Sequence, residues 1–188
     1  MIKVYLILVF FLLIFSCNED YTPKPKGYFR IDFPEKAYQE TKSDCPYSFE
    51  YPVYSQIVPD VSQNAEPCWT NIKFKSLNAT LHLSYKNVNN NLYKLLEDAH
   101  AMAYKHTIKA DAINEKAFSD KNKKVYALLY EIKGDAASRL QFIVTDSVKH
   151  YLRGALYFNS RPNKDSLAPV INFIKPDIEH LIETFYWK

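Results

Sequence analysis

Glycine is scarce in this sequence, with only 3 among 188 residues. Loops that cradle nucleotide phosphates need several glycines at fixed spacing, so the shortage excludes a P-loop and a dinucleotide-binding loop. The sequence also contains neither HExxH nor GxSxG, the signatures of zinc proteases and of α/β-hydrolases. We therefore expect no catalytic residue and no cofactor, and the chain is predicted not to be an enzyme.

The sequence also lacks an excess of charge of either sign. Its 24 basic and 21 acidic residues give a net charge of +3 and are interspersed. Proteins that bind nucleic acid concentrate their basic residues, so no nucleic-acid partner is expected. Five histidines are scattered along the chain, and His100 and His106 would point to different sides of a helix. No metal site and no small-molecule substrate are expected.

One long hydrophobic run stands at the start, from Val4 to Phe15 after Lys3. It is too short to span a bilayer, which takes roughly 20 apolar residues, and is typical of a signal peptide. Small Ser16 directly before Cys17 is the pattern of a bacterial lipoprotein signal. The sequence thus predicts a signal peptide over residues 1–16 and lipidation of Cys17, which ties the mature protein to a membrane outside the cytoplasm. The alternative is an ordinary signal peptide with an incidental cysteine.

A polar stretch with two prolines, residues 17–27, follows and predicts an extended, semi-rigid tether. Asn18 after the cysteine resembles the sorting signal of bacterial lipoproteins that reach the outer membrane. Whether the periplasmic face or the cell surface is occupied stays open. Residues 28–188 are predicted to form a single globular domain.

Two further cysteines, Cys45 and Cys68, invite a disulfide because the chain is exported. Closing that loop would stabilise the fold by about 3 kcal/mol in the chain-entropy model. A pair of buried free thiols is the alternative.

Alternation of apolar and polar residues predicts strands, and spacing of three and four predicts helices. The expected strands are 28–33, 46–52, 69–75, 80–85, 112–118, 125–133, 139–145 and 150–159. The expected helices start after residue 91 and near Asp165 or Ser166, which would cap the second, and Pro176 is expected to kink or break that helix near Lys175. The prediction is an α+β domain, an antiparallel sheet with a four-strand meander covered by two helices. This order is similar to the PsbP-like architecture of small extracytoplasmic accessory proteins.

Several stretches of the chain resemble the gliding motility lipoprotein GldD family of Bacteroidota. They are PKPKGYFRIDFP at 23–34, CPYSFEYPVY at 45–54, CWTNIKF at 68–74, LSYK at 83–86, YKHTIKADAI at 104–113 and LYFNSRPNKDSLAPVINFI at 156–174. The resemblance implies an envelope lipoprotein needed for gliding motility and for the linked type IX secretion system. It implies other gliding and secretion envelope proteins as partners and supplies no catalytic residue.

Two polar stretches are candidate partner-binding sites. The first gathers Lys105, His106, Lys109 and Asp111 at the end of the first helix, where cations also complement the helix dipole. The second contains Arg161, Asn163 and Asp165 before the closing helix, where they also suit a turn and a cap. For each stretch, partner binding and a purely structural role both stay open.

Ser147 and Ser166 each follow an aspartate and precede an aliphatic residue, which resembles the O-glycosylation acceptor of Bacteroidota. A hairpin turn and a helix cap are the alternatives. A different function class is also open, an envelope hydrolase or glycan-binding lipoprotein whose pocket uses Trp69, Tyr85 and the stretch 104–111. A purely structural lipoprotein is a third possibility.

Overall fold

The computed structural model describes residues 30–105 and 110–188. The predicted signal peptide, Cys17 and the tether lie outside the described residues, as do His106 and Lys109. Contacts within the chain separate the residues up to Ile31 from a compact unit, Asp32–Lys188, and the following description concerns that unit. The predicted division at residue 28 stays a prediction.

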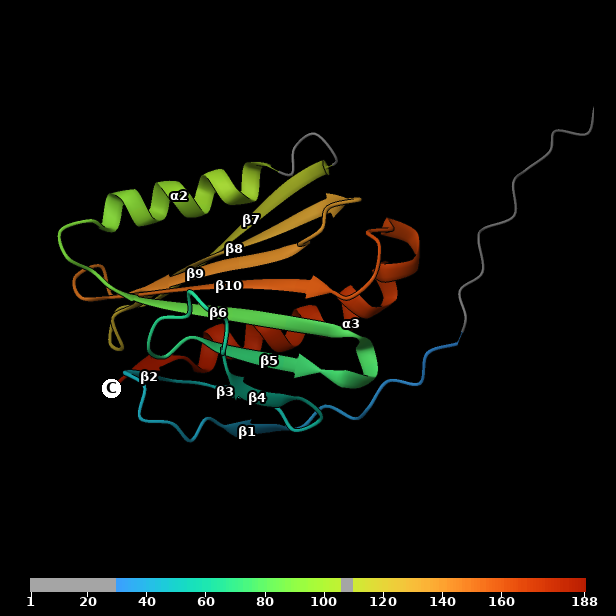
Figure 1. Ribbon diagram of the computed structural model, residues 1–188, viewed down its shortest axis with the longest axis horizontal. Coiled ribbons are helices and arrows are strands. Elements are labelled where there is room, and N and C mark those ends of the chain that lie inside the picture. Colours follow the sequence, from blue (N-terminus) through green and yellow to red (C-terminus); the bar gives the residue numbers. More distant parts are fainter. Residues whose placement is uncertain (1–29, 106–109) are drawn as a thin grey trace, which may run out of the picture. The chain divides into compact units, whose positions relative to one another are not determined.

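A seven-stranded antiparallel sheet forms the centre of this unit (Figure 1). Its spatial order is β4-β5-β6-β10-β9-β8-β7. The strands are β4 (Gln56–Pro59), β5 (Thr70–Phe74), β6 (Ala79–Asn87), β7 (Ala110–Asp120), β8 (Val125–Gly134), β9 (Leu140–Thr145) and β10 (His150–Phe158). The meander is confirmed as β7 to β10, and β10 pairs with β6, which joins it to the earlier strands.

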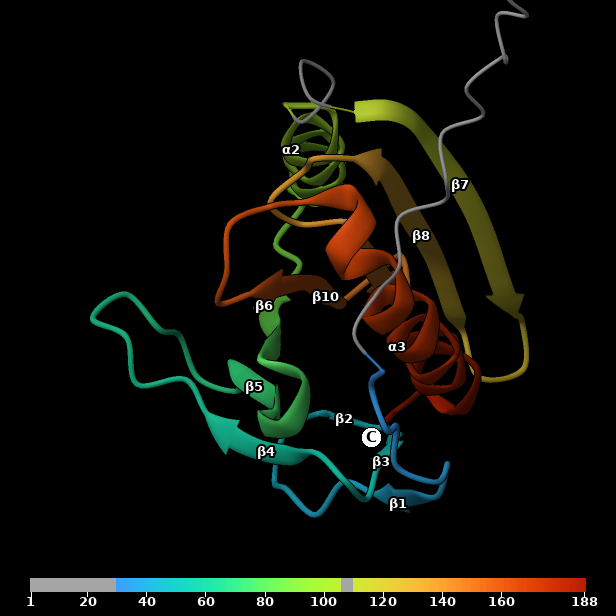
Figure 2. The ribbon, with the colours of Figure 1, turned by 90° about the vertical axis from the view of Figure 1, so that its right-hand side faces the viewer.

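Two helices cover opposite faces of the sheet (Figure 2). The closing helix α3 (Lys164–Thr184) packs on the face that we call inner, where it meets Leu129, Phe142 and Leu152. The earlier helix α2 (Leu92–Tyr104) lies on the outer face, where its Ala99 packs with Ile143 and Tyr151. Neighbouring residues of one strand point to opposite faces, so Tyr151 and Leu152 belong to different layers. The predicted α+β architecture is confirmed.

One close approach in the sheet requires glycine. A Cβ atom at Gly154 on β10 would lie 2.2 Å from Cε1 of the Phe142 ring on β9. Phe142 is fully buried, so this ring fills the space that a side chain at residue 154 would occupy. The glycine thus lets a large aromatic side chain enter the inner layer.

Two short sheets stand beside the main one and correct the prediction for the early strands. Strand β1 (Tyr38–Glu40) pairs with β3 (Glu50–Pro52), and β2 (Tyr47–Ser48) pairs with β11 (Tyr186–Trp187). The strand predicted at 28–33 is wrong over its described residues 30–33, which belong to no strand of the structure. The strand predicted at 46–52 is divided at Phe49, whose buried ring stacks on Phe185.

The prediction for α3 was wrong in two respects. The helix runs through Pro176, so a break near Lys175 is wrong, whereas a kink there stays a prediction. Its N-cap is Asn163 and not Asp165 or Ser166. The Asn163 side chain accepts a hydrogen bond from the backbone N–H of Ser166, which satisfies one of the free donors of the first turn.

Candidate functional site

The two stretches predicted to bind partners meet at one end of the sheet. Asp111 lies in β7 and Lys164 opens α3, and Lys164 Nζ is 3.0 Å from Asp111 Oδ2. Both side chains are more than half exposed. The hydrogen bond with Asp111 and the attraction of its charge raise the pKa of Lys164. This ion pair is therefore accessible from outside.

The turn between β8 and β9 holds the start of α3 in this position. Asp135 Oδ1 accepts a hydrogen bond from the backbone N–H of Lys164 at 2.6 Å. Arg139 Nη1 donates to the carbonyl oxygen of Lys164 at 3.3 Å. Arg161 and the capping Asn163 lie exposed on the same connection. We call this surface the polar end, and its residues are Asp111, Asp135, Arg161, Asn163, Lys164 and Asp165.

The other predicted residue of the first stretch lies at the end of α2. Lys105 is its C-cap, and the backbone N–H of Lys105 bonds to carbonyl oxygens within the helix. Tyr104 next to it donates from its hydroxyl to Glu115 of β7 at 3.1 Å. Only part of the predicted first stretch is thus placed at the polar end among the residues that the structure describes.

Ser147 and Ser166 are both exposed. Ser147 lies in the β9–β10 turn with a φ of 68°, and Asp146 Oδ1 accepts hydrogen bonds from three backbone N–H groups after it. Burial acts against ionisation of Asp146, but these donors together lower its pKa. Ser166 lies in the first turn of α3. Modification of either serine stays a prediction.

Cys45 and Cys68 are joined as a disulfide, with their Cα atoms 5.5 Å apart. The bond ties the segment before β2 to the β4–β5 connection. Next to it, the Tyr47 hydroxyl donates to the carbonyl oxygen of Cys68 at 2.7 Å. Trp69 follows, and its indole N–H donates to the carbonyl oxygen of Tyr85. Trp69 lines a cleft along α2, whereas the Tyr85 ring is buried in the inner layer, and residues 106–109 of the stretch 104–111 lie outside the described residues.

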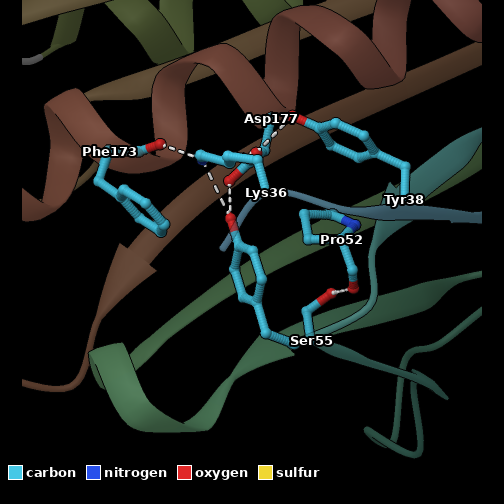
Figure 3. A network of polar contacts seen from close by, with 7 residues as sticks. Lys36, Tyr38, Pro52, Ser55, Phe173 and Asp177 are labelled. Carbon is cyan, nitrogen blue, oxygen red and sulfur yellow. Dashed lines mark hydrogen bonds and ion pairs between the residues drawn. The ribbon is translucent and has the colours of Figure 1, made fainter. Parts of the chain in front are cut away.

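A buried carboxylate stands at the centre of a polar network that the sequence analysis missed (Figure 3). Asp177 on α3 is 2% exposed, and its Oδ1 receives the Lys36 ammonium at 2.6 Å and the Tyr38 hydroxyl at 2.9 Å. The Tyr54 hydroxyl donates to Oδ2. A charge is costly to bury unless it is paired and hydrogen-bonded, and Asp177 meets both conditions.

Lys36 also contacts α3 close to its internal proline. Pro176 has no N–H, and its ring crowds the carbonyl group four residues earlier. The Lys36 ammonium donates to the neighbouring carbonyl oxygen of Phe173 at 2.6 Å and lies 3.6 Å from the centre of the Phe173 ring. The network therefore fastens the segment around Lys36 to the turn of α3 that contains Pro176.

The properties of this network fit a structural role, holding the early segment on α3, better than acid–base catalysis. Burial, followed by the hydrogen bond to Asp177 and its negative charge, raises the pKa of Tyr38 to about 12. The same causes raise the pKa of Tyr54. Both hydroxyls stay protonated donors at neutral pH, whereas a general acid or base needs a pKa near the working pH.

A signal in the sequence could have found Asp177. It follows Ile174 by three residues and precedes Leu181 by four, so it lies within the apolar stripe of the helix. A carboxylate in such a stripe requires a buried donor. Nothing in the local pattern identifies Lys36 as that donor, since it lies 141 residues earlier.

No helix among the described residues combines the length and the apolar character that crossing a membrane requires. Within the same residues, no three or more His, Cys, Asp or Glu side chains gather into a group that could hold a metal ion.

Comparisons with known proteins extend these observations. The model of a family described as gliding motility lipoprotein GldD matches residues 18–187. The solution structure of cyanobacterial PsbP from Synechocystis is similar over 89% of this chain and 100% of its own, with a TM-score of 0.51 and 13% identity. At that identity the likeness concerns the fold, and it agrees with the architecture expected from the sequence. A search among curated proteins found no match.

Proposed function

Because this chain belongs to the gliding motility lipoprotein GldD family, we propose that it is an accessory or scaffold subunit of the gliding apparatus and the linked type IX secretion system. It acts by contact with other envelope proteins and not as an enzyme. The observation that carries the proposal is the family match, which spans residues 18–187 and so begins directly after the predicted lipidated cysteine.

The chain is held in the cell envelope of its Bacteroidota host by lipid on Cys17. Asn18 favours the outer membrane as the site of the anchor, on the side facing the periplasm or the cell surface. The tether 17–27 separates the lipid from the globular domain, which begins near residue 28. Lipid and domain therefore have separate tasks, attachment and recognition.

The polar end is the surface best suited to recognition. Asp111 and Lys164 are both accessible and come from elements far apart in the sequence, so the folded domain presents a charge pattern that no single segment has. An exposed ion pair contributes about 0–1 kcal/mol to stability. Its charges are therefore free to serve contact with a partner at little cost to the fold.

A deletion strain of the native host tests the proposed function. It is complemented with the wild-type gene or with Cys17→Ala, and is scored for colony spreading and for secretion of a type IX cargo. Loss of both in the deletion strain, restored by wild type but not by Cys17→Ala, is the expected result. Normal spreading and secretion in the deletion strain would exclude the proposal.

A charge exchange tests the role of the polar end. Lys164→Glu breaks the pair with Asp111, and Asp111→Lys with Lys164→Glu restores it in reverse. If the pair is only internal support, the double variant behaves as wild type. We expect both variants to fold normally by circular dichroism and both to reduce spreading, because a partner reads the charge at each position. Wild-type spreading of the double variant would count against a docking role.

A further inference from the structure

A cleft runs along α2 on the outer face of the sheet. Its volume is about 350 Å³, which falls within the usual range of ligand sites. Its floor includes Ser84 of β6 and Arg153 of β10, one wall is formed by Leu95 and Met102 of α2, and Trp69 lies on the opposite side. The cleft is separate from the polar end and from the Asp177 network.

Arg153 lies half-buried in this cleft. Its Nη2 donates to Gln141 Oε1 at 2.6 Å. In the part of the chain that the structure describes, no acidic side chain forms an ion pair with Arg153. Guanidinium groups carry five N–H donors and bind carboxylates through two of them, so a neutral amide satisfies this one only in part.

Gln141 is a second, independent sign of a binding site. It is 2% exposed, and its buried Nε2 has no hydrogen-bond partner among residues 30–105 and 110–188. Leaving such a group unsatisfied costs about 1–3 kcal/mol, so the glutamine side chain at this position reduces the stability of the fold. What it provides is an acceptor that fixes the direction of the Arg153 side chain. The remaining N–H groups of Arg153 are then held ready for an anion.

The surroundings narrow the chemistry of that anion. Asp98 of α2 faces the same cleft, and the Lys86 ammonium pairs with Glu66. The negative charge of Asp98 repels an anion with several charges, such as phosphate, more strongly than it repels a single carboxylate, so the singly charged group fits better. Leu95, Met102 and the Trp69 ring offer apolar contacts beside it. A ligand with a carboxylate next to an apolar side chain fits both the Arg153 guanidinium and these apolar contacts.

We propose that this cleft binds a polypeptide segment of a partner protein through one acidic side chain, whose carboxylate Arg153 receives. An apolar side chain next to that acid enters between Trp69 and α2. The inference rests on the proposed function, since it supplies the chemistry of one protein contact. Gln141 acts as a positioning residue that holds Arg153 in the binding direction.

The test uses the mature chain 17–188 with Cys17→Ala, titrated with three probes and followed by NMR. The probes are acetyl-Leu-Asp-Leu-amide, acetyl-Leu-Asn-Leu-amide and sodium acetate. We expect the aspartate peptide to shift the indole N–H signal of Trp69 and the Nε–H signal of Arg153, with at least tenfold tighter binding than either other probe. Arg153→Gln should weaken binding of the aspartate peptide at least tenfold. Lys73→Gln, which removes an exposed cation from the same face outside the cleft, should leave it unchanged.

A second variant guards against misfolding of the first. Ser84→Phe fills the floor of the cleft and keeps Arg153, so loss of binding with an otherwise unchanged spectrum supports the site. Equal affinity for the aspartate and asparagine peptides, or for acetate, would overturn the proposal, as would unchanged binding by Ser84→Phe.

Motility separates this proposal from the broader one. If the deletion strain fails to spread while Arg153→Gln and Ser84→Phe strains spread normally, the cleft proposal fails and the proposed function stands. If the deletion strain spreads normally, the proposed function fails, whatever the peptide titration shows.

Discussion

Removal of the Lys36 ammonium should destabilise the protein far more than removal of an exposed cation. In Lys36→Met the Asp177 carboxylate, whose side chain is 1% exposed, keeps two hydroxyl donors but loses its counter-charge. Removing one partner of a buried ion pair costs about 3–5 kcal/mol. The Lys36 side chain is 32% exposed and partly solvated, so we expect the lower end, about 3 kcal/mol.

The assay is urea unfolding of the unlipidated mature chain, read from the midpoint at constant slope. Lys116→Met is the matched control. Lys116 of β7 also pairs with a carboxylate of α3, that of Glu179 at 3.1 Å, but the Lys116 side chain is 51% exposed. That change should cost about 0–1 kcal/mol. In the double variant Lys36→Met with Asp177→Asn, the loss of unfolding free energy should be smaller than the sum of the losses in the two single variants. Equal effects of Lys36→Met and Lys116→Met would refute the argument that burial makes the network strong.

Three further predictions concern stability. Replacing Cys45 and Cys68 by alanine should lower the free energy of unfolding by about 3 kcal/mol, and reductant should do the same to the wild type but not to the double variant. The pKa of Tyr38 is raised from about 10 to about 12, so with rising pH the tyrosine loses its proton in the unfolded state before it does so in the folded state. The free energy of unfolding should therefore fall between about pH 10 and 12. This fall should be smaller in Tyr38→Phe. Gly154→Ala places a Cβ atom against the Phe142 ring and should cost about 1–3 kcal/mol; an unchanged urea midpoint would show that the ring moves freely.

The meander and both helices could be predicted because their patterns are local. Strands β7 to β10 alternate, and short polar connections such as Asp146–Lys149 leave few alternatives to antiparallel neighbours. The early strands could not be assigned in the same way. Their pairing depends on residues far along the chain, as when β2 pairs with β11, and alternation gives no information about such partners.

The candidate sites likewise contain residues that a local pattern identifies and contacts that depend on distant parts of the chain. Asp111, Arg161 and Asn163 were identified from composition, but their approach at one end follows from the strand order that places β7 at an edge. The environment of Arg153 was not predicted, because an arginine in an alternating strand resembles any outward-facing residue. Its significance depends on Gln141, which lies on a neighbouring strand.

The pairing of residues 47–48 with residues 186–187 also sets the order in which the protein can fold. Lys36 and Asp177 impose the same order, being 141 residues apart. Contacts of such long sequence separation slow folding, because a large loop must close before they form. Strand β2 therefore has no strand to pair with until β11 has been synthesised, whereas β1 can pair with the nearby β3 before that. A truncation that removes β11 would leave β2 without its pairing strand and open to non-native contacts.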